Sequence, residues 1–330
     1  MKPSQTRAAL ELLVDQRRPV FLWGAPGIGK SDIVYQLAHD RRIGFIDKRL
    51  SQSDPTELKG LPWPDAERGV MRFLRDDELP VDGEGILFLD EMNNAPASVQ
   101  APAYQLILNR RLGKYVLPDG WAVVAAGNRS SDRSVVHKMA AALANRFVHI
   151  DMQPDTEDWI AWALNHGGIS SGTVGYIRYR PANLYTEVVP VDARAFPSPR
   201  SWMFADKIAN DTRIEPAVQH ELIAGTVGEG CAVEYLGFIR EAANLPNIEA
   251  ILLAPEKVKV PSEPSTLYAV IGKLEHSVTP GNFETLLRYA KRMPKEYEVV
   301  FAMSCARNRK DIIETAAMTQ YIIDNRDNFA

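Results

Sequence analysis

A glycine-rich stretch near the amino terminus has residue types and a spacing that suit phosphate binding. It reads GAPGIGKS and follows the apolar run PVFLW. Its glycines let the backbone turn tightly, so that backbone N–H groups can face phosphate oxygens. Lys30 offers an ammonium group to the β- and γ-phosphates, and Ser31 offers a hydroxyl to Mg²⁺. We therefore expect a nucleotide-binding loop made of Gly24, Ala25, Pro26, Gly27, Ile28, Gly29, Lys30 and Ser31.

Two carboxylates follow an apolar run about 60 residues after Lys30, in the stretch ILFLDEMNNA. In a parallel sheet, the carboxyl end of this strand lies at the edge that binds ligands. Asp90 would then hold Mg²⁺, and Glu91 would orient and deprotonate the attacking water. An exposed acidic strand end is the alternative interpretation, and the preceding phosphate loop makes it the weaker one.

Three other residues are candidates for contacts with the nucleotide. Asn128 ends the apolar run VVAAGN and can direct its amide at the γ-phosphate or at the lytic water, although Gly-Asn also ends strands in ordinary turns. Arg146 ends a helical run and can face the γ-phosphate of a neighbouring subunit, or simply cap its helix. Arg200, in FPSPRSW, begins a helix and can lie over the nucleotide or on a solvated surface.

The order of elements predicts an α/β domain over residues 1–152. Short apolar runs alternate with helical patterns, which is typical of a parallel sheet covered on both faces. After residue 152 the patterns become helical. We expect a helical lid over residues 153–214, which carries Arg200, and a helical C-terminal extension over residues 215–330.

The composition is that of a globular protein without a strong charge bias. The 330 residues include 45% apolar and 24% charged residues, and the formal net charge is −4. This balance disfavours a dedicated nucleic-acid binder but leaves room for a local basic path. Two isolated cysteines and the absence of a long apolar run predict a soluble cytoplasmic protein, with no disulfide framework and no membrane partner.

Taken together, the motifs resemble those of an AAA+ ATPase. The resemblance rests on the order of phosphate loop, Asp-Glu strand, Asn strand, Asn-Arg-Phe and Ser-Pro-Arg, and it covers roughly residues 19–207. The segment of about residues 53–82 resembles the helix-2 insertion of one AAA+ clade. The segment of about residues 109–121 resembles the pre-sensor-1 hairpin of the same clade. The chain therefore looks MoxR-like, close to the branch associated with von Willebrand factor A domain proteins.

The resemblance implies roles for the matching residues. The phosphate loop becomes Walker A, and Asp90 and Glu91 become Walker B. Asn128 becomes sensor 1, Arg146 the arginine finger and Arg200 sensor 2. It also implies ATP and Mg²⁺ as cofactors and a homo-oligomeric ring, expected to be a hexamer, with each ATP shared by two subunits. Other arginines that could serve as the finger are Arg110, Arg111, Arg129 and Arg133.

Two classes of function fit these expectations. A ring that remodels, loads or activates a partner protein would grip polypeptide with the apolar residues Trp63, Met71 and Phe73 of the first insertion. A nucleic-acid translocase or helicase would use the neighbouring arginines on phosphates instead. The acidic balance favours the first class. A small-molecule kinase is a third class, which Arg146, Arg200 and both insertions disfavour.

Overall fold

A computed structural model describes the chain except for residues 130–138, 140, 190–191, 243–244 and 327–330. The chain divides into two compact units, Met1–Pro154 and Asp155–Ala330. Among the described residues, no helix combines the length and the apolar character that a bilayer crossing requires.

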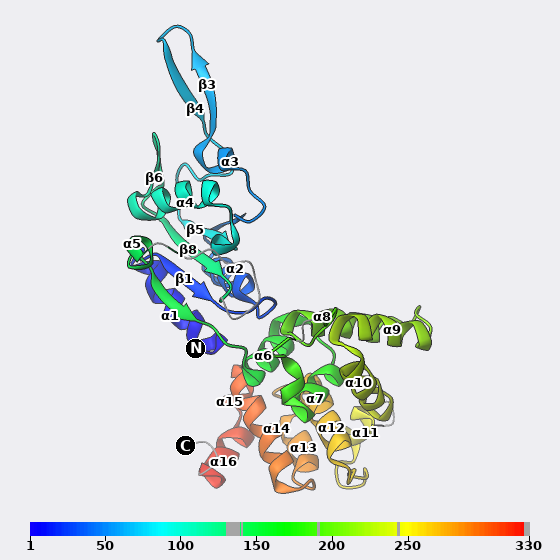
Figure 1. Ribbon diagram of the computed structural model, residues 1–330. Helices are drawn as coiled ribbons and strands as arrows, with labels where there is room; N and C mark the ends of the chain where they lie inside the picture. Colours follow the sequence, from blue (N-terminus) through cyan, green and yellow to red (C-terminus); the bar gives the residue numbers. More distant parts are fainter. Residues whose placement is uncertain (130–138, 140, 190–191, 243–244, 327–330) are drawn as a thin grey trace. The chain divides into compact units, whose positions relative to one another are not determined.

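The first unit is built on a parallel sheet of five strands, in the order β2-β5-β8-β1-β9 (Figure 1). Its elements are α1 (Pro3–Asp15), β1 (Val20–Trp23), α2 (Lys30–Arg41), β2 (Gly44–Arg49), α3 (Pro55–Lys59), β3 (Leu61–Asp65), β4 (Val70–Leu74), β5 (Gly85–Asp90), η1 (Met92–Asn94), α4 (Ala97–Asn109), β6 (Arg111–Leu112), β7 (Tyr115–Val116), β8 (Trp121–Gly127), α5 (Ala141–Ala144) and β9 (Val148–Asp151).

Alternation along the central strands explains why helices cover both faces of this sheet. On β1, Val20 and Leu22 belong to a core that also contains apolar residues of α1 and α2. Phe21, between them, belongs to a second core that contains apolar residues of α4. Successive side chains of a strand point to opposite faces, so a strand that is apolar throughout needs a helical layer on each side.

Two small antiparallel hairpins interrupt the α/β pattern. Strands β3 and β4 pair from Leu61↔Leu74 to Asp65↔Val70 and project from the body of the first unit (Figure 1). Strands β6 and β7 form a shorter hairpin between α4 and β8, turning at Gly113, where φ is 59°. The two hairpins lie within the segments of about residues 53–82 and 109–121.

The second unit is helical in its described part. Its elements are α6 (Thr156–Trp162), the π-helical turn η3 (Ala163–Gly167), α7 (Ser171–Tyr179), η4 (Pro181–Leu184), α8 (Pro199–Ala209), α9 (Pro216–Val227), α10 (Glu229–Ala242), α11 (Ile248–Leu253), α12 (Pro264–Ser277), α13 (Phe283–Ala290), α14 (Lys295–Asn308), α15 (Lys310–Ile313) and α16 (Ala316–Asp324). Its two apolar cores centre on Trp202 and Tyr235 and on Phe283 and Phe301.

The predicted fold class is confirmed. A parallel five-stranded sheet lies between helices, and a helical C-terminal part follows. The apolar strands are buried as their composition requires: every described side chain of β8 is buried, as are the first five residues of β5.

Candidate functional site

The predicted phosphate loop joins the end of β1 to the start of α2. Gly27 and Gly29 have φ values of 78° and 90°, which side-chain-bearing residues rarely adopt. A Cβ atom added to Gly24 would lie 2.5 Å from the Cδ1 atom of Ile28 and 3.0 Å from the carbonyl oxygen of Met152. The loop thus needs glycine for its turns and for close packing. It leads into the N-terminus of α2, where backbone N–H groups and the helix dipole favour an anion.

Lys30 lies at the first position of α2 and is buried. Its ammonium group donates to the carbonyl oxygens of Gly24, at 2.6 Å, and Ala25, at 3.0 Å. It also donates to the Oδ1 atom of Asn128 at 3.2 Å. The lysine therefore connects the loop after β1 with Asn128, the residue directly after the neighbouring strand β8. Ser31, the next residue, is half-buried.

Asp90 and Glu91 lie at the end of β5, which is separated from β1 only by β8. The Asp90 side chain accepts a hydrogen bond of 2.8 Å from the backbone N–H of Glu91. Burial raises the pKa of the Asp90 carboxyl, and the positive charge of Lys30 offsets part of the rise. Glu91 itself has a φ of 53°, a left-handed conformation that turns the chain sharply between β5 and η1.

Ser51 was not predicted from the sequence, yet its hydroxyl donates a hydrogen bond to the Oε2 atom of Glu91. Ser51 follows β2, which pairs with β5 up to Arg49↔Asp90. This strand pairing explains the contact, because residues just beyond the ends of two paired parallel strands lie side by side. One carboxylate oxygen of Glu91 is thus held by a neighbour, which limits the rotation of the side chain.

Asn93 is the second residue that sequence reasoning missed. Its amide donates to the carbonyl oxygen of Asn128 at 2.7 Å, and its Oδ1 atom accepts from the backbone N–H of Asn128 at 3.2 Å. A Cβ atom on Gly127 would lie 2.1 Å from that Oδ1 atom, so the close approach requires glycine. The buried Asn93 therefore orients the backbone of Asn128. The stretch DEMNNAP held both asparagines, but nothing in its spacing distinguished Asn93 from Asn94.

Arg146 lies away from its own phosphate loop. It precedes β9, whose Val148 pairs with Val20 at the start of β1, whereas the phosphate loop follows the end of β1. Three residues of strand, about 10 Å, separate these two edges of the sheet. Arg146 is exposed, and its guanidinium forms no ion pair with the residues that the structure describes.

The other candidate arginines differ from Arg146 in their surroundings. Arg110 is half-buried and donates to the carbonyl oxygens of Pro118 and Trp121, at 2.7 and 2.8 Å. Arg129 forms an ion pair with Asp151 at 3.1 Å and also donates to the backbone. Arg111 is exposed on β6, and Arg133 lies outside the described residues.

Arg200 belongs to the second unit, where it is exposed in the first turn of α8. This helix begins at Ser198, whose hydroxyl accepts a hydrogen bond of 3.1 Å from the backbone N–H of Ser201. Such a cap defines where the helix starts and therefore which residues form its first turn. Among the predicted site residues, Arg200 is the one that lies in the second unit.

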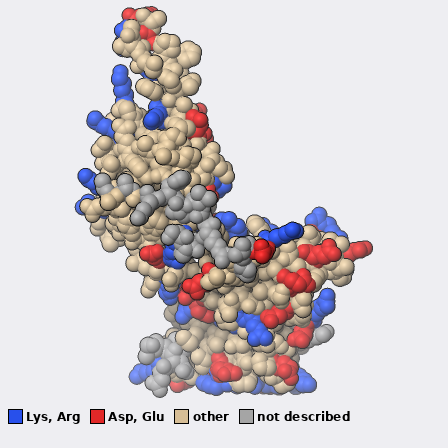
Figure 2. All heavy atoms as spheres, viewed as in Figure 1, with Lys and Arg blue, Asp and Glu red and all other residues tan. Residues whose placement is uncertain are grey.

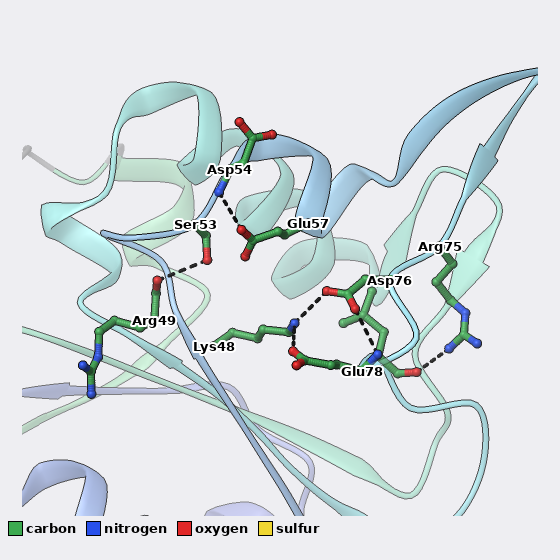
Figure 3. Close-up of polar contacts among 9 residues, drawn as sticks. Lys48, Arg49, Ser53, Asp54, Glu57, Arg75, Asp76 and Glu78 are labelled. Atoms are coloured by element: carbon green, nitrogen blue, oxygen red, sulfur yellow. Dashed lines mark hydrogen bonds and ion pairs between the residues drawn. The ribbon is translucent and has the colours of Figure 1, made fainter.

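A cluster of charges connects β2 with the base of the β3–β4 hairpin. Figure 3 shows the Lys48 side chain pointing between the carboxylates of Asp76 and Glu78. The Lys48–Asp76 distance is 2.6 Å, and only 6% of the lysine side chain is exposed. The two carboxylates raise the pKa of Lys48 against the opposing effect of burial. The ion pairs thus attach the chain leaving the hairpin to the strand that precedes Ser51.

The two hairpins are also joined to each other. The Arg75 guanidinium lies 5.9 Å from the centre of the Tyr115 ring, and the Tyr115 hydroxyl donates to the carbonyl oxygen of Pro80 at 2.8 Å. Burial raises the pKa of Tyr115 to about 12. In Figure 2 the projecting β3–β4 hairpin is mostly uncharged, with charged groups near its tip. Its exposed apolar side chains are Leu61, Trp63, Val70, Met71, Phe73 and Leu74.

The residues present suit a nucleotide with Mg²⁺. Gly24 is closely packed, and Gly27 and Gly29 have left-handed conformations. Because these positions carry no side chains, backbone groups of the loop can surround a small anion. The Asp90 carboxylate and the Ser31 hydroxyl are hard oxygen donors of the kind that Mg²⁺ prefers. A divalent cation would also offset the burial that raises the pKa of Asp90.

No protein-family model matches the sequence, and no curated protein does. Solved structures that resemble the chain include a mutant of RuvB from Thermotoga maritima (12% identity, TM-score 0.37, 98% of this chain and 88% of that one). NtrX from Brucella abortus is 13% identical with a TM-score of 0.43, and the match covers 91% of this chain and 67% of that one. The replication initiator DnaA, in a structure bound to AMPPCP and single-stranded DNA, is 13% identical with a TM-score of 0.39. That match covers 96% of this chain and 92% of DnaA.

Proposed function

We propose that this chain is an Mg²⁺-dependent ATP hydrolase of the AAA+ type, MoxR-like, which uses ATP to remodel or activate a partner protein. The supporting observation is the arrangement of three adjacent strands, β5, β8 and β1. At their carboxyl ends lie the pair Asp90-Glu91, Asn128 and the phosphate loop, with Lys30 bonded to Asn128. Hydrolysis of a nucleotide needs a general base close to its terminal phosphate. The carboxyl end of an apolar strand beside the phosphate loop is such a position.

Each residue has a defined task in the proposed reaction. The loop N–H groups and Lys30 hold the phosphates, and Asn128 directs its amide at the γ-phosphate or the attacking water. Glu91 takes a proton from that water. The oxygen of the water attacks the γ-phosphorus, and the bond between the γ-phosphorus and the oxygen that bridges it to the β-phosphate breaks. Ser31 and Asp90 would hold Mg²⁺, which neutralises phosphate charge when bound.

Arg146 is proposed to act in the site of a neighbouring subunit. Its position before β9, at the sheet edge opposite the phosphate loop, argues against a contact with its own ATP. An exposed guanidinium is free to meet the γ-phosphate of the next subunit, where an arginine can accelerate hydrolysis by roughly 10³–10⁵. The proposal therefore includes a ring, expected to be a hexamer. Arg200, from the second unit, is proposed as the cation that the same chain adds to its site.

A polypeptide is the preferred substrate of the proposed motor. The β3–β4 hairpin exposes apolar side chains, including Trp63 at 55%, Met71 at 64% and Phe73 at 59%. Two basic groups of this region are already engaged: Arg72 of β4 pairs with Asp65 at 2.6 Å, and Arg110, directly before β6, binds backbone carbonyls. An apolar surface of this kind suits an unfolded segment or a von Willebrand factor A domain partner better than a phosphate backbone.

The test uses two inactive variants, Glu91→Gln and Arg146→Ala. We expect the ATP turnover rate of Glu91→Gln alone to be roughly 10²–10⁴-fold lower, because the variant lacks the general base. Arg146→Ala alone should also be nearly inactive. When the two are mixed and reassembled, some sites combine Glu91 from one chain with Arg146 from the next, and ATP turnover should recover.

The shared-site proposal fails if no mixture recovers, or if Arg146→Ala alone turns over ATP at the normal rate. Lys30→Ala serves as the control for nucleotide binding. It should weaken binding of a fluorescent ATP analogue, whereas Glu91→Gln and Arg146→Ala should still bind it.

A further inference from the structure

His149 connects the strand before the phosphate loop with the segment that carries Arg146. The indole N–H of Trp23 donates to the Nδ1 atom of His149 at 2.8 Å. The Nε2 atom of His149 lies 2.8 Å from the carbonyl oxygen of Ala144. Trp23 is the last residue of β1, directly before the phosphate loop, and Ala144 ends α5, two residues before Arg146.

These two contacts favour one tautomer of the imidazole ring. An indole N–H can only donate, so Nδ1 must be the unprotonated acceptor. In the tautomer that satisfies both contacts, Nε2 carries a proton and donates it to the Ala144 carbonyl. Both nitrogens are engaged although the side chain is on the surface, and the ring has one orientation that satisfies both partners.

Aromatic packing reinforces the same connection. The imidazole stacks on the Trp23 ring, with 6.0 Å between centroids, and lies 6.1 Å from the ring of Phe147. Phe147 in turn meets Phe21 of β1 edge-on at 5.4 Å. Phe147 follows Arg146 directly, so the residues on both sides of the arginine are attached to β1 and β9.

We propose that His149 is a positioning residue, which holds Arg146 at the angle needed to reach the ATP of the neighbouring subunit. This inference rests on the proposed function. Helix α5 has only four residues, too few to be stable without external contacts. The hydrogen bond to its last carbonyl group supplies such a contact. A misplacement of about 1 Å in a reacting group can cost roughly 10²-fold in rate, so a single anchor has a large effect.

Three substitutions separate the two hydrogen bonds. His149→Gln keeps an N–H near the Nε2 position for the Ala144 carbonyl. His149→Asn keeps an acceptor near the Nδ1 position for Trp23, and His149→Phe keeps a ring without either bond. We expect ATP turnover to fall at least 10-fold in the Phe and Asn variants and less than 3-fold in the Gln variant, with KM for ATP unchanged. His39→Phe, at an exposed position on α2, is the matched control and should remain active.

Mixing experiments determine on which site His149 acts. His149→Phe supplies an intact Glu91, so it should regain activity with Glu91→Gln, whose Arg146 is intact. It should not regain activity with Arg146→Ala, since neither chain then has a working arginine. Recovery with Glu91→Gln would also show that the His149→Phe chain is folded.

The opposite pattern overturns the proposal. If His149→Phe recovered when mixed with Arg146→Ala but not when mixed with Glu91→Gln, His149 would support the phosphate loop of its own chain. Full activity of His149→Phe, or a Gln variant no better than the Asn variant, would overturn it as well. If the mixture of Arg146→Ala and Glu91→Gln does not recover, the shared site itself is wrong and His149 loses its proposed role. These outcomes distinguish a failure of this inference from a failure of the proposed function.

Discussion

The orientation of Asn128 depends on Asn93, a neighbour with no proposed role in the reaction itself. Asn93 binds both the N–H and the carbonyl group of Asn128, while the Asn128 side chain accepts from Lys30. The amide proposed to sense the γ-phosphate is therefore held through its backbone on one side and through the phosphate-loop lysine on the other. A residue with two such constraints has little freedom to adopt other rotamers, which is what a positioned catalytic group requires.

We expect Asn93→Ala to lower kcat for ATP more than it raises KM. The substitution removes both hydrogen bonds between Asn93 and the backbone of Asn128, at a cost of about 1–3 kcal/mol in unfolding free energy. Steady-state kinetics and urea denaturation measure the two effects. Asn94→Ala is the matched control, because the Asn94 Oδ1 atom is buried without a hydrogen-bond partner among the described residues. Equal losses in both variants would contradict the role given to Asn93.

The β3–β4 hairpin is an element whose strands alone do not explain its stability. A two-stranded hairpin is at best marginally stable in water, and this one exposes apolar residues along both strands. Its base is held by the ion pairs of Lys48 with Asp76 and Glu78. Since Lys48 lies on β2, three residues before Ser51, the same strand connects the hairpin with the residue that holds Glu91.

Lys48→Met should destabilise the first unit by about 1–3 kcal/mol, because it leaves the carboxylate of Asp76 largely buried without its cation. Arg72→Met is the control within the same hairpin. It breaks the pair with Asp65, but 48% of the Arg72 side chain is exposed, so less than about 1 kcal/mol should be lost. Urea denaturation followed by tryptophan fluorescence compares the two variants. A larger loss for Arg72→Met would show that the ion pairs at the base do not stabilise the hairpin.

At the scale of the whole molecule, charge and exposed apolar surface both favour a protein partner. A net charge of −4 gives no long-range attraction for nucleic acid. A projecting hairpin with exposed apolar side chains is instead the kind of surface that marks protein interaction sites. The choice between the two classes of motor therefore depends on what stimulates ATP turnover.

We expect an unfolded polypeptide, such as reduced and alkylated lactalbumin, to raise ATP turnover several-fold, and single- or double-stranded DNA to leave it unchanged. Replacing Met71 and Phe73 by Ser should remove the stimulation. Leu12→Ser, at an apolar position of α1 that is 58% exposed, is the matched control and should retain it. Stimulation by DNA that declines steeply with salt would instead identify a nucleic-acid motor.

Local features of the sequence were sufficient to predict the α/β class, and they identified the glycine-rich loop as a candidate nucleotide site. Strand and helix follow from the spacing of apolar residues, and the phosphate loop is one continuous stretch whose glycines and lysine have their meaning in the order of the chain. The fold class is confirmed, whereas the phosphate-binding role of the glycine-rich loop and the roles of Asp90, Glu91, Asn128, Arg146 and Arg200 stay predictions.

Only the tertiary structure revealed the residues that position the candidate site. Asn93 meets Asn128 across 35 residues, Ser51 meets Glu91 across 40, and Trp23 meets His149 across 126. These contacts depend on which strands are neighbours in the sheet and on where each strand ends. Sequence spacing carries no signal for such pairs, because a side chain contacts whatever the fold brings beside it.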